Sequence, residues 1–246
     1  AFLASRKLLA RRFSATIARP AGLAFERPAA GALLRRRFDM KFRPTLLVFG
    51  LALTAAVVTT AQAEGNVAEG KIRAYTCHGC HGIESYRNAF PNYAVPKLGG
   101  QNAKYLENAL KAYASGERSH PTMFSQASGM TDQARADLAA FLAGEPTQRS
   151  GQVVGTPPAA TQTCVACHGA DGAQTVSDEY PKLAGQYADY IVQALKDYKS
   201  GKRKNPVMAG IIGAVEEKDF EAIARFFAQQ PGLCTTNVIA KNGKCN

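Results

Sequence analysis

The chain has 246 residues, which is enough for one large or two small domains. Its formal net charge of +11 at pH 7 would suit a nucleic-acid partner, but residues 1–63 hold 11 of the 30 Lys and Arg side chains. Residues 64–246 have 19 basic and 17 acidic side chains, a net of +2, and this balance excludes nucleic acid as the expected partner.

Residues 40–63 have the pattern of a secretory signal peptide. Two basic residues come first, an uncharged apolar core runs from Leu46 to Val58, and Ala61-Gln62-Ala63 is a small-x-small cleavage site. Cleavage there makes Glu64 the first residue of the mature protein. The alternative is an uncleaved membrane anchor, which the Thr, Ala and Gln content of the stretch argues against.

Residues 1–39 form an extension upstream of Met40 that contains Arg35-Arg36-Arg37. We interpret the extension as translated sequence before the true start, outside the mature protein. An Arg-rich organelle presequence is the alternative.

An internal repeat indicates two domains. Residues 96–123 align without a gap to residues 181–208, with 16 identities in 28 positions. The predicted domains are 64–146 and 159–246, and the intervening segment 147–158, which contains Gly, Thr and two Pro residues, is the predicted linker. Domains of this size rarely fold stably on a small apolar core alone, so a buried cofactor would supply missing contacts.

The apolar periodicity within each copy is helical. Residues at i, i+4 and i+7 are Leu106, Leu110 and Tyr113 in the first copy and Ile191, Leu195 and Tyr198 in the second. Thr131 is expected to cap a helix that ends at Gly144, and a partner helix is expected from about Glu216 to Pro231. No strand-like alternation occurs in residues 64–246, so we expect an all-α fold of small helical bundles with long loops.

Two Cys-x-x-Cys-His runs carry the chemistry. They are Cys77, Cys80 and His81 in the first copy and Cys164, Cys167 and His168 in the second. This is the c-type haem attachment signature, because two thiols about one helical turn apart reach both vinyl groups of a haem while the next residue places its imidazole under the iron. A redox dithiol or half of a zinc site is the alternative for one run, but two matched runs predict two covalently bound haem c groups.

The second axial ligand of each iron must come from the opposite side of the ring, and His with Met is a common pair. Met123 and Met208 occupy the same repeat position, in the motif Pro-x-Met. Met130 aligns with a valine and is expected to pack in the core. We therefore favour Met123 over Met130 as the ligand in the first copy.

Two further histidines are poor candidates for iron ligands. His120 is aligned with Asn205 in the second copy, and His78 lies inside the attachment loop, where it is poorly placed to bind that iron. Both are expected to be surface side chains.

Pro96 and Pro181 begin the repeated Pro-x-Leu-x-Gly stretches. A ligating histidine usually donates its other ring N–H to a carbonyl that fixes its orientation, and the main-chain oxygens of these prolines are our candidates. A simple turn into the next helix is the alternative.

Cys234 and Cys245 lie eleven residues apart near the C-terminus. In an oxidising compartment we expect them to form a disulfide that pins the tail. A free or metal-binding pair is the alternative.

Residues 64–246 resemble the dihaem cytochrome c4 family, which has two class I cytochrome c domains in tandem. The motifs that carry the resemblance are Cys-x-x-Cys-His-Gly at 77–82 and 164–169, Pro-x-Leu-x-Gly-Gln at 96–101 and 181–186, and Pro-x-Met at 121–123 and 206–208. Residues 1–39 and the tail from Pro231 depart from the family pattern.

The resemblance implies His81 with Met123, and His168 with Met208, as axial pairs, and places the proline carbonyls on the histidines. It also implies that the propionate edges of the haems meet near the domain interface.

In function, the resemblance implies a bacterial periplasmic single-electron carrier, not an enzyme, that delivers electrons to a terminal haem-copper oxidase. Its partners would be redox proteins, including an upstream reductase or dehydrogenase, with peripheral association with membrane complexes. The alternative is a dihaem electron-accepting subunit of a dehydrogenase such as a sulfide-oxidising flavoenzyme. A haem peroxidase or thiosulfate-type oxidase needs an open iron position or a cysteine ligand, which the two matched methionines argue against.

The two copies differ most in charge just before Met208, where Lys199, Lys202, Arg203 and Lys204 cluster. We expect a local basic rim there to orient an acidic partner. A solvated helix end is the alternative.

Overall fold

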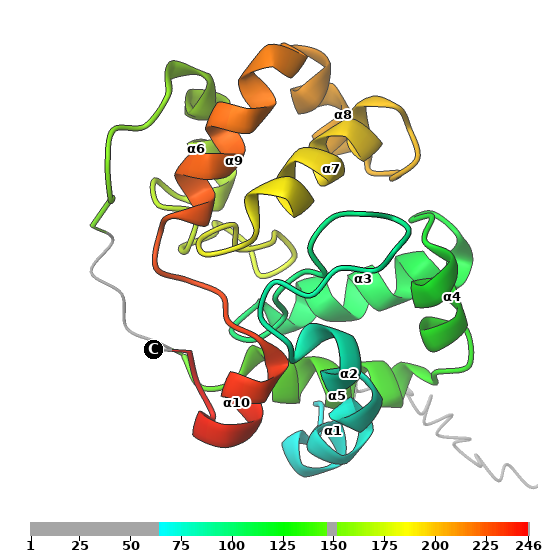
Figure 1. The fold of residues 1–246 in the computed structure, drawn as a ribbon. Coiled ribbons are helices and arrows are strands. Elements are labelled where there is room, and N and C mark those ends of the chain that lie inside the picture. The colour runs from blue at the N-terminus through cyan, green and yellow to red at the C-terminus, as the bar shows by residue number, and fades with distance from the viewer. Residues whose placement is uncertain (1–63, 147–151, 246) are drawn as a thin grey trace, which may run out of the picture. The chain divides into compact units, whose positions relative to one another are not determined.

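The computed structural model describes residues 64–146 and 152–245 (Figure 1). The predicted extension at 1–39, the predicted signal peptide at 40–63 and part of the predicted linker lie outside these residues. The described ranges contain ten α-helices, three 3₁₀ turns and no β-strand, in agreement with the all-α expectation. No helix in these ranges is long and apolar enough to cross a lipid bilayer.

The first copy is built around two helices that pack against each other. Its elements are α1 (Val67–Arg73), a 3₁₀ turn (Ala74–Thr76), α2 (His78–His81), α3 (Ala103–Ser115), α4 (Pro121–Ala127) and α5 (Asp132–Ala143). Leu106 and Leu110 of α3 share a buried core with Leu138 of α5. Helix α1 approaches α5 so closely that a Cβ at Gly70 would overlap the carbonyl oxygen of Asp137. A glycine is therefore needed at this crossing.

The second copy repeats this arrangement. Its elements are a 3₁₀ turn (Ala159–Thr161), α6 (Gln162–His168), α7 (Ala188–Lys199), α8 (Pro206–Gly213), a 3₁₀ turn (Glu217–Asp219) and α9 (Phe220–Ala228). Ile191 and Leu195 of α7 share a buried core with Phe220, Ile223 and Phe227 of α9. The helix expected from about Glu216 is thus a 3₁₀ turn followed by α9.

Local chemistry explains where the central helices begin and end. The Thr131 hydroxyl accepts a hydrogen bond from the N–H of Ala134 (3.1 Å) at the start of α5, as the sequence predicts. Gly144 follows α5 with φ of +62°, and Gly116 follows α3 with φ of +78°. These left-handed conformations favour glycine, which ends each helix.

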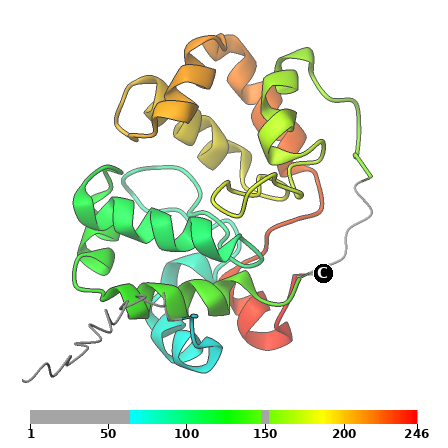
Figure 2. The ribbon, with the colours of Figure 1, turned by 180° about the vertical axis from the view of Figure 1, so that it is seen from behind.

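The C-terminal tail packs onto the first copy, as both ribbon views show (Figure 1, Figure 2). Gly99 and Cys234 exchange two backbone hydrogen bonds of 2.9 and 3.1 Å. Helix α10 (Thr236–Asn242) lies against α2 and α5, and Ile239 and Cys245 are buried in the core of the first copy.

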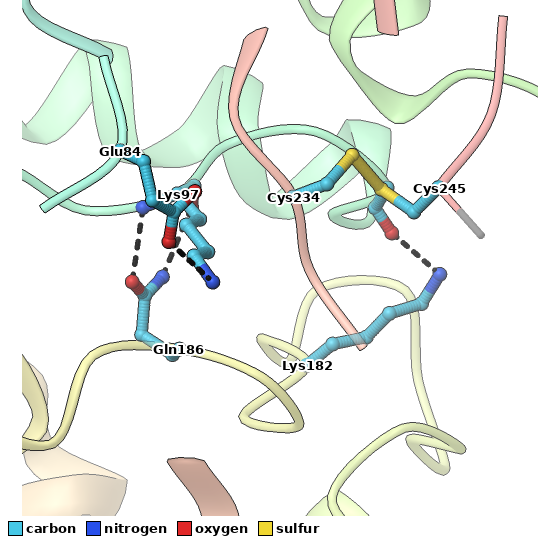
Figure 3. The surroundings of a disulfide bond; sticks show 7 residues. Glu84, Lys97, Lys182, Gln186, Cys234 and Cys245 are labelled. Carbon is cyan, nitrogen blue, oxygen red and sulfur yellow. Dashed lines mark hydrogen bonds and ion pairs between the residues drawn. A yellow bond between two sulfur atoms is a disulfide. The ribbon is translucent and has the colours of Figure 1, made fainter. Parts of the chain in front are cut away.

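The tail also contains the disulfide expected between Cys234 and Cys245 (Figure 3). This bond closes a loop that encloses α10. The sequence predicts one C-terminal domain at 159–246, and in the structure the tail of this segment adds buried side chains to the core of the first domain.

Candidate functional site

The first Cys-x-x-Cys-His run folds as a short helix that ends in a buried histidine. Cys77 follows the 3₁₀ turn and precedes α2, and the N–H of His81 donates to its carbonyl at 2.8 Å. Cys77 and Cys80 are free thiols, and burial raises the pKa of the Cys77 thiol. His81 is 8 % exposed, with its Nδ1 2.7 Å from the carbonyl oxygen of Pro96.

The second run repeats this geometry on α6. Cys164 and Cys167 are free thiols, and His168 is 6 % exposed. Its Nδ1 lies 2.8 Å from the carbonyl oxygen of Pro181. In the structure each histidine thus lies within hydrogen-bond distance of the proline oxygen that the sequence predicts as its acceptor.

These contacts define the state of both imidazole rings. A carbonyl oxygen only accepts hydrogen bonds, so Nδ1 donates, and in the neutral ring Nε2 is then the unprotonated nitrogen. Burial lowers the pKa of His168, and it lowers the pKa of His81 to about 4. A neutral ring with a fixed tautomer is what metal ligation through Nε2 requires.

Met123 and Met208 lie in the first turns of the equivalent helices α4 and α8. His120 Nδ1 accepts the N–H of Met123 at 3.3 Å, and Asn205 Oδ1 accepts the N–H of Met208 at 3.1 Å. A proline at the first helical position follows each cap. These caps are not among the features predicted from the sequence, although a polar residue precedes Pro-x-Met in both copies and could have indicated them.

The two additional histidines are only partly exposed, whereas the sequence predicts surface side chains. His120 is half-buried as the cap of α4. His78 is also half-buried, with its Nδ1 2.7 Å from Thr236 Oγ1 of the tail and its ring edge-on to Phe141 at a centroid distance of 6.4 Å. Each ring has a polar partner within the fold and is therefore held in place although it is partly exposed.

A cavity of about 550 Å³ adjoins both sites. Both buried histidines, both matched methionines and both cysteine pairs line it. Its apolar wall includes Leu106, Leu110, Leu142, Ile191, Leu195 and Ile212. Met130 lines the same cavity, so the structure places both candidate methionines of the first copy near the site.

Two arginines at equivalent repeat positions line the same cavity. Arg203, which is 8 % exposed, donates to the Tyr105 hydroxyl at 2.6 Å, and Arg118 donates to the Tyr190 hydroxyl. Each guanidinium lies over a tyrosine ring of its own copy, at 4.4 Å for Arg118 and 4.6 Å for Arg203. Among the described residues, no carboxylate lies within 4.0 Å of either guanidinium.

The inward position of Arg203 corrects the expected basic rim. Its guanidinium is satisfied by tyrosine hydroxyl and ring contacts, so it contributes nothing to an exposed surface. Lys202 and Lys204 are exposed, while their backbones pair with the equivalent loop of the first copy. The N–H of Lys204 donates to the Glu117 carbonyl at 2.8 Å, and the N–H of Ser119 donates to the Lys202 carbonyl at 3.4 Å.

These features fit two covalently bound haem c groups. Each copy supplies two free thiols, a neutral histidine and a methionine thioether around a largely apolar space. The two arginines add positive charge without a carboxylate partner, which suits the carboxylate groups that haem carries.

Comparison with known proteins agrees with this chemistry. Residues 67–144 and 158–229 match the Cytochrome c family. Cytochrome c4 of Pseudomonas aeruginosa is 30% identical over 200 residues, which cover 73% of this chain and 96% of that protein. The thiosulfate dehydrogenase electron acceptor of Stutzerimonas stutzeri is 31% identical over 173 residues, or 63% of this chain and 79% of that protein.

A solved structure shows the same architecture. The cytochrome c4 of Acidithiobacillus ferrooxidans aligns with a TM-score of 0.51 at 27% identity, covering 63% of this chain and 98% of that one. Two matched regions, two complete attachment motifs and these relatives all indicate one family. The chain therefore belongs to the cytochrome c family, as a two-domain, dihaem electron-transfer protein of the cytochrome c4 type.

Proposed function

We propose that this protein carries single electrons in the periplasm and delivers them to a terminal haem-copper oxidase. The observation that carries the proposal is the matched pair of buried histidines, each with Nδ1 2.7 or 2.8 Å from a proline carbonyl. When bound, each haem supplies a one-electron iron couple whose potential depends on the axial ligands and their hydrogen bonds.

The chain's own residues hold each iron on both sides in this proposal. The thioether bonds form at Cys77 and Cys80 in the first domain and at Cys164 and Cys167 in the second. His81 and Met123 would bind the iron of the first domain, and His168 and Met208 would bind that of the second. An iron with two protein ligands has no open position, which suits electron transfer better than catalysis at the metal.

The local structure favours Met123 over Met130 as the ligand. Met123 and Met208 both follow a cap and a proline at the start of a helix, so their backbones are fixed in the same way. Met130 instead lies in the turn before α5, where its N–H donates to the carbonyl of Ala127 at 3.2 Å. The second copy has no methionine at that position.

Arg118 and Arg203 are the residues that we assign to the haem carboxylates. The buried guanidinium of Arg203 and the half-buried guanidinium of Arg118 repel each other, and negative partners would stabilise both. Burial alone would raise the pKa of the Tyr105 hydroxyl, yet the two nearby guanidiniums outweigh burial and lower it. This local excess of positive charge supports carboxylate binding at the cavity.

Two features support a periplasmic location. The pattern of residues 40–63 is that of a cleaved export signal. The Cys234–Cys245 disulfide fits an oxidising compartment, because such bonds are rare in the cytosol of most organisms.

A second candidate function is the acceptance of electrons from a dehydrogenase of sulfur compounds. It is favoured by the relative named thiosulfate dehydrogenase electron acceptor, which is 31% identical. The two roles share the same haem chemistry and differ in the partner that reduces the protein and in whether the partner stays bound.

Stopped-flow kinetics with two partners separates these roles. A carrier should be oxidised rapidly by membranes that contain the terminal oxidase, in a cyanide-sensitive reaction, and should purify without a stable partner. Stoichiometric co-purification with a dehydrogenase, together with no oxidation by these membranes, would overturn the oxidase proposal and support the second role.

A further inference from the structure

The peptide group that joins each of the two prolines to the next lysine forms one hydrogen bond at its carbonyl oxygen and another at its N–H. In the first domain the Pro96 carbonyl accepts from His81 Nδ1 at 2.7 Å, and the N–H of Lys97 donates to Gln186 Oε1 at 2.9 Å. That carbonyl and that N–H belong to the same planar peptide group. Figure 3 shows Gln186 reaching from the second domain to the backbone of Lys97.

The second domain has the same arrangement in the opposite direction. The Pro181 carbonyl accepts from His168 Nδ1 at 2.8 Å, and the N–H of Lys182 donates to Gln101 Oε1 at 2.7 Å. Gln101 belongs to the first domain. Each histidine therefore ends a chain of two hydrogen bonds that begins on a glutamine of the other domain.

Each glutamine forms two hydrogen bonds with the backbone of its lysine, Gln186 with Lys97 and Gln101 with Lys182. Gln186 Nε2 donates to the Lys97 carbonyl at 2.9 Å, and Gln101 Nε2 donates to the Lys182 carbonyl at 3.0 Å. Each Oε1 also accepts the N–H of the residue that follows the glutamine, at 2.9 Å for Gln101 and 3.1 Å for Gln186. These bonds fix the orientation of both amides, because the oxygen meets only donors and the nitrogen meets only acceptors.

The lysine side chains do not share this symmetry. Lys97 forms an ion pair with Glu84 at 3.2 Å, whereas Lys182 Nζ donates to the Gly100 carbonyl at 2.8 Å (Figure 3). What the two domains share is the pair of hydrogen bonds between each glutamine amide and the backbone N–H and carbonyl of the lysine, which we call the glutamine clamp. The clamp is therefore the feature that can act equally on both histidines.

Burial makes these bonds effective. Gln101 is 3 % exposed and Gln186 is 5 % exposed, so water does not compete for their amides. In a medium of low dielectric constant, linked hydrogen bonds polarise one another. Acceptance of the Lys N–H by the glutamine shifts negative charge onto the proline oxygen, and this strengthens its bond to the histidine Nδ1–H.

The tail holds the two proline segments side by side. The N–H of Leu233 donates to the Ala184 carbonyl at 2.8 Å, and the N–H of the next residue, Cys234, donates to the Gly99 carbonyl at 3.1 Å. Ala184 and Gly99 are equivalent positions of the repeat. Two consecutive tail residues thus bind equivalent positions of the two proline segments, and this holds the segments in the relative position that the glutamine hydrogen bonds need.

We propose that Gln101 is a positioning residue for His168 and Gln186 for His81, so that each domain adjusts the iron ligand of the other. The inference rests on the proposed role of both histidines as iron ligands. A stronger hydrogen bond at Nδ1 makes the imidazole more electron-rich and favours the oxidised iron. Loss of a glutamine clamp should therefore raise the reduction potential of the haem in the opposite domain.

The test replaces each glutamine by methionine, which has similar length and forms no strong hydrogen bonds. Gln101→Met should raise the potential of the second haem, and Gln186→Met should raise that of the first. We expect the electron distribution between the haems to change by about threefold to tenfold, or about 30 to 60 mV for a one-electron couple. Met123→Ala and Met208→Ala variants identify which potential belongs to which haem.

Gln230 provides a matched control. It is 1 % exposed, its Oε1 accepts the N–H of Val154 at 2.8 Å, and its Nε2 donates to the Val154 carbonyl at 2.9 Å. This clamp joins the second domain to the preceding linker and does not touch either proline peptide. Gln230→Met should lower thermal stability and leave both potentials unchanged.

A second readout does not depend on electron transfer. In reduced protein labelled with ¹⁵N-histidine, the Nδ1–H proton of His168 should move upfield in Gln101→Met, and that of His81 should remain in place. Gln101→Glu keeps the acceptor oxygen, so it should hold the second potential at or below that of the wild type. This variant also serves if Gln101→Met does not fold.

Three results would overturn the inference. They are a shift confined to the haem of the mutated domain, equal shifts in Gln101→Met and Gln230→Met, and a higher second potential in Gln101→Glu. Failure of the proposed function would look different, because the wild-type spectrum itself would then lack iron-bound signals from His81 and His168.

Discussion

Met123 and Met208 each lie in the first turn of a helix, and this turn is fixed by a side-chain cap and a proline. This environment limits the positions that the thioether can reach, which suits a group that must meet an iron from a set direction. Met130 lines the same cavity without such a fixed start.

The first prediction concerns the iron ligands themselves. Met123→Ala or Met208→Ala should remove one iron–sulfur bond, lower the potential of that haem and reduce the weak near-infrared band of Met-ligated ferric haem by about half, because two irons contribute. Met130→Ala is the control and should leave the band unchanged. If Met130→Ala weakens the band and Met123→Ala does not, the assignment in the first domain is wrong.

The second prediction concerns the cap of α8. Asn205→Ala removes the acceptor for the N–H of Met208 and should cost about 1 kcal/mol of stability. The loosened first turn should also let added imidazole displace Met208 faster, as an optical titration would record. Asn205→Asp keeps an acceptor and should behave like the wild type. Equal displacement rates in the alanine variant and the wild type would show that the cap does not hold the ligand.

Single residues differ in how far the sequence identifies them. The cysteines and histidines of both runs follow from local spacing, because that spacing is set by the geometry of one helix and one haem. The partners of Arg203, Gln101 and Gln186 lie in the other copy, 81 to 98 positions away. No local pattern encodes such contacts, so Arg203 was wrongly expected at the surface.

At the scale of elements, the tail is the main asymmetry between two otherwise similar domains. It crosses from the second domain to the first and contacts the attachment helix α2 there. His78 Nδ1 lies 2.7 Å from Thr236 Oγ1, and Asn237 Nδ2 donates to the Gly82 carbonyl at 3.0 Å. The first haem site is therefore supported by the C-terminal tail, which follows the second domain in the sequence.

The third prediction concerns the disulfide in this tail. Replacing Cys234 and Cys245 together by serine should destabilise the protein by about 2–4 kcal/mol, since the open tail gains conformational freedom when it detaches. Hydrogen exchange should quicken at Gly99 and Glu145, whose N–H groups donate to tail carbonyls at 2.9 and 2.8 Å.

The amide of Gly185 is the internal control for that measurement. Its N–H donates to the Phe227 carbonyl within the second domain at 3.0 Å, so its exchange should change little. Equal loss of protection at Gly99 and Gly185 would contradict local support of the first domain by the tail.

Helices and tail differ in how well the sequence predicts them. The helices α3, α5, α7 and α9 follow from apolar spacing and from Thr131 and Gly144, because amphipathic periodicity reports burial directly. The destination of α10 could not be read in this way. An apolar side chain such as Ile239 could pack on any apolar surface. Only the three-dimensional structure shows that it packs in the core of the first domain.

At the scale of the whole molecule, duplication produces two sites that are joined through shared contacts. The cavity adjoins both sites, the arginines reach tyrosines of the opposite copy, and the glutamines reach its proline segments. Because each domain contacts the other in this way, a substitution in one domain should change the haem environment in the other. Two haems in one chain can then act as a coupled pair.

A potentiometric titration followed by the optical spectrum tests this account most directly, because it counts the haems and reports their ligation together. We expect two one-electron steps, low-spin spectra throughout, and a near-infrared Met–iron band in the oxidised protein that disappears in two stages as the two irons are reduced. A single step with one haem per chain, or an iron that stays high-spin and binds cyanide readily, would contradict two haems each held by a histidine and a methionine.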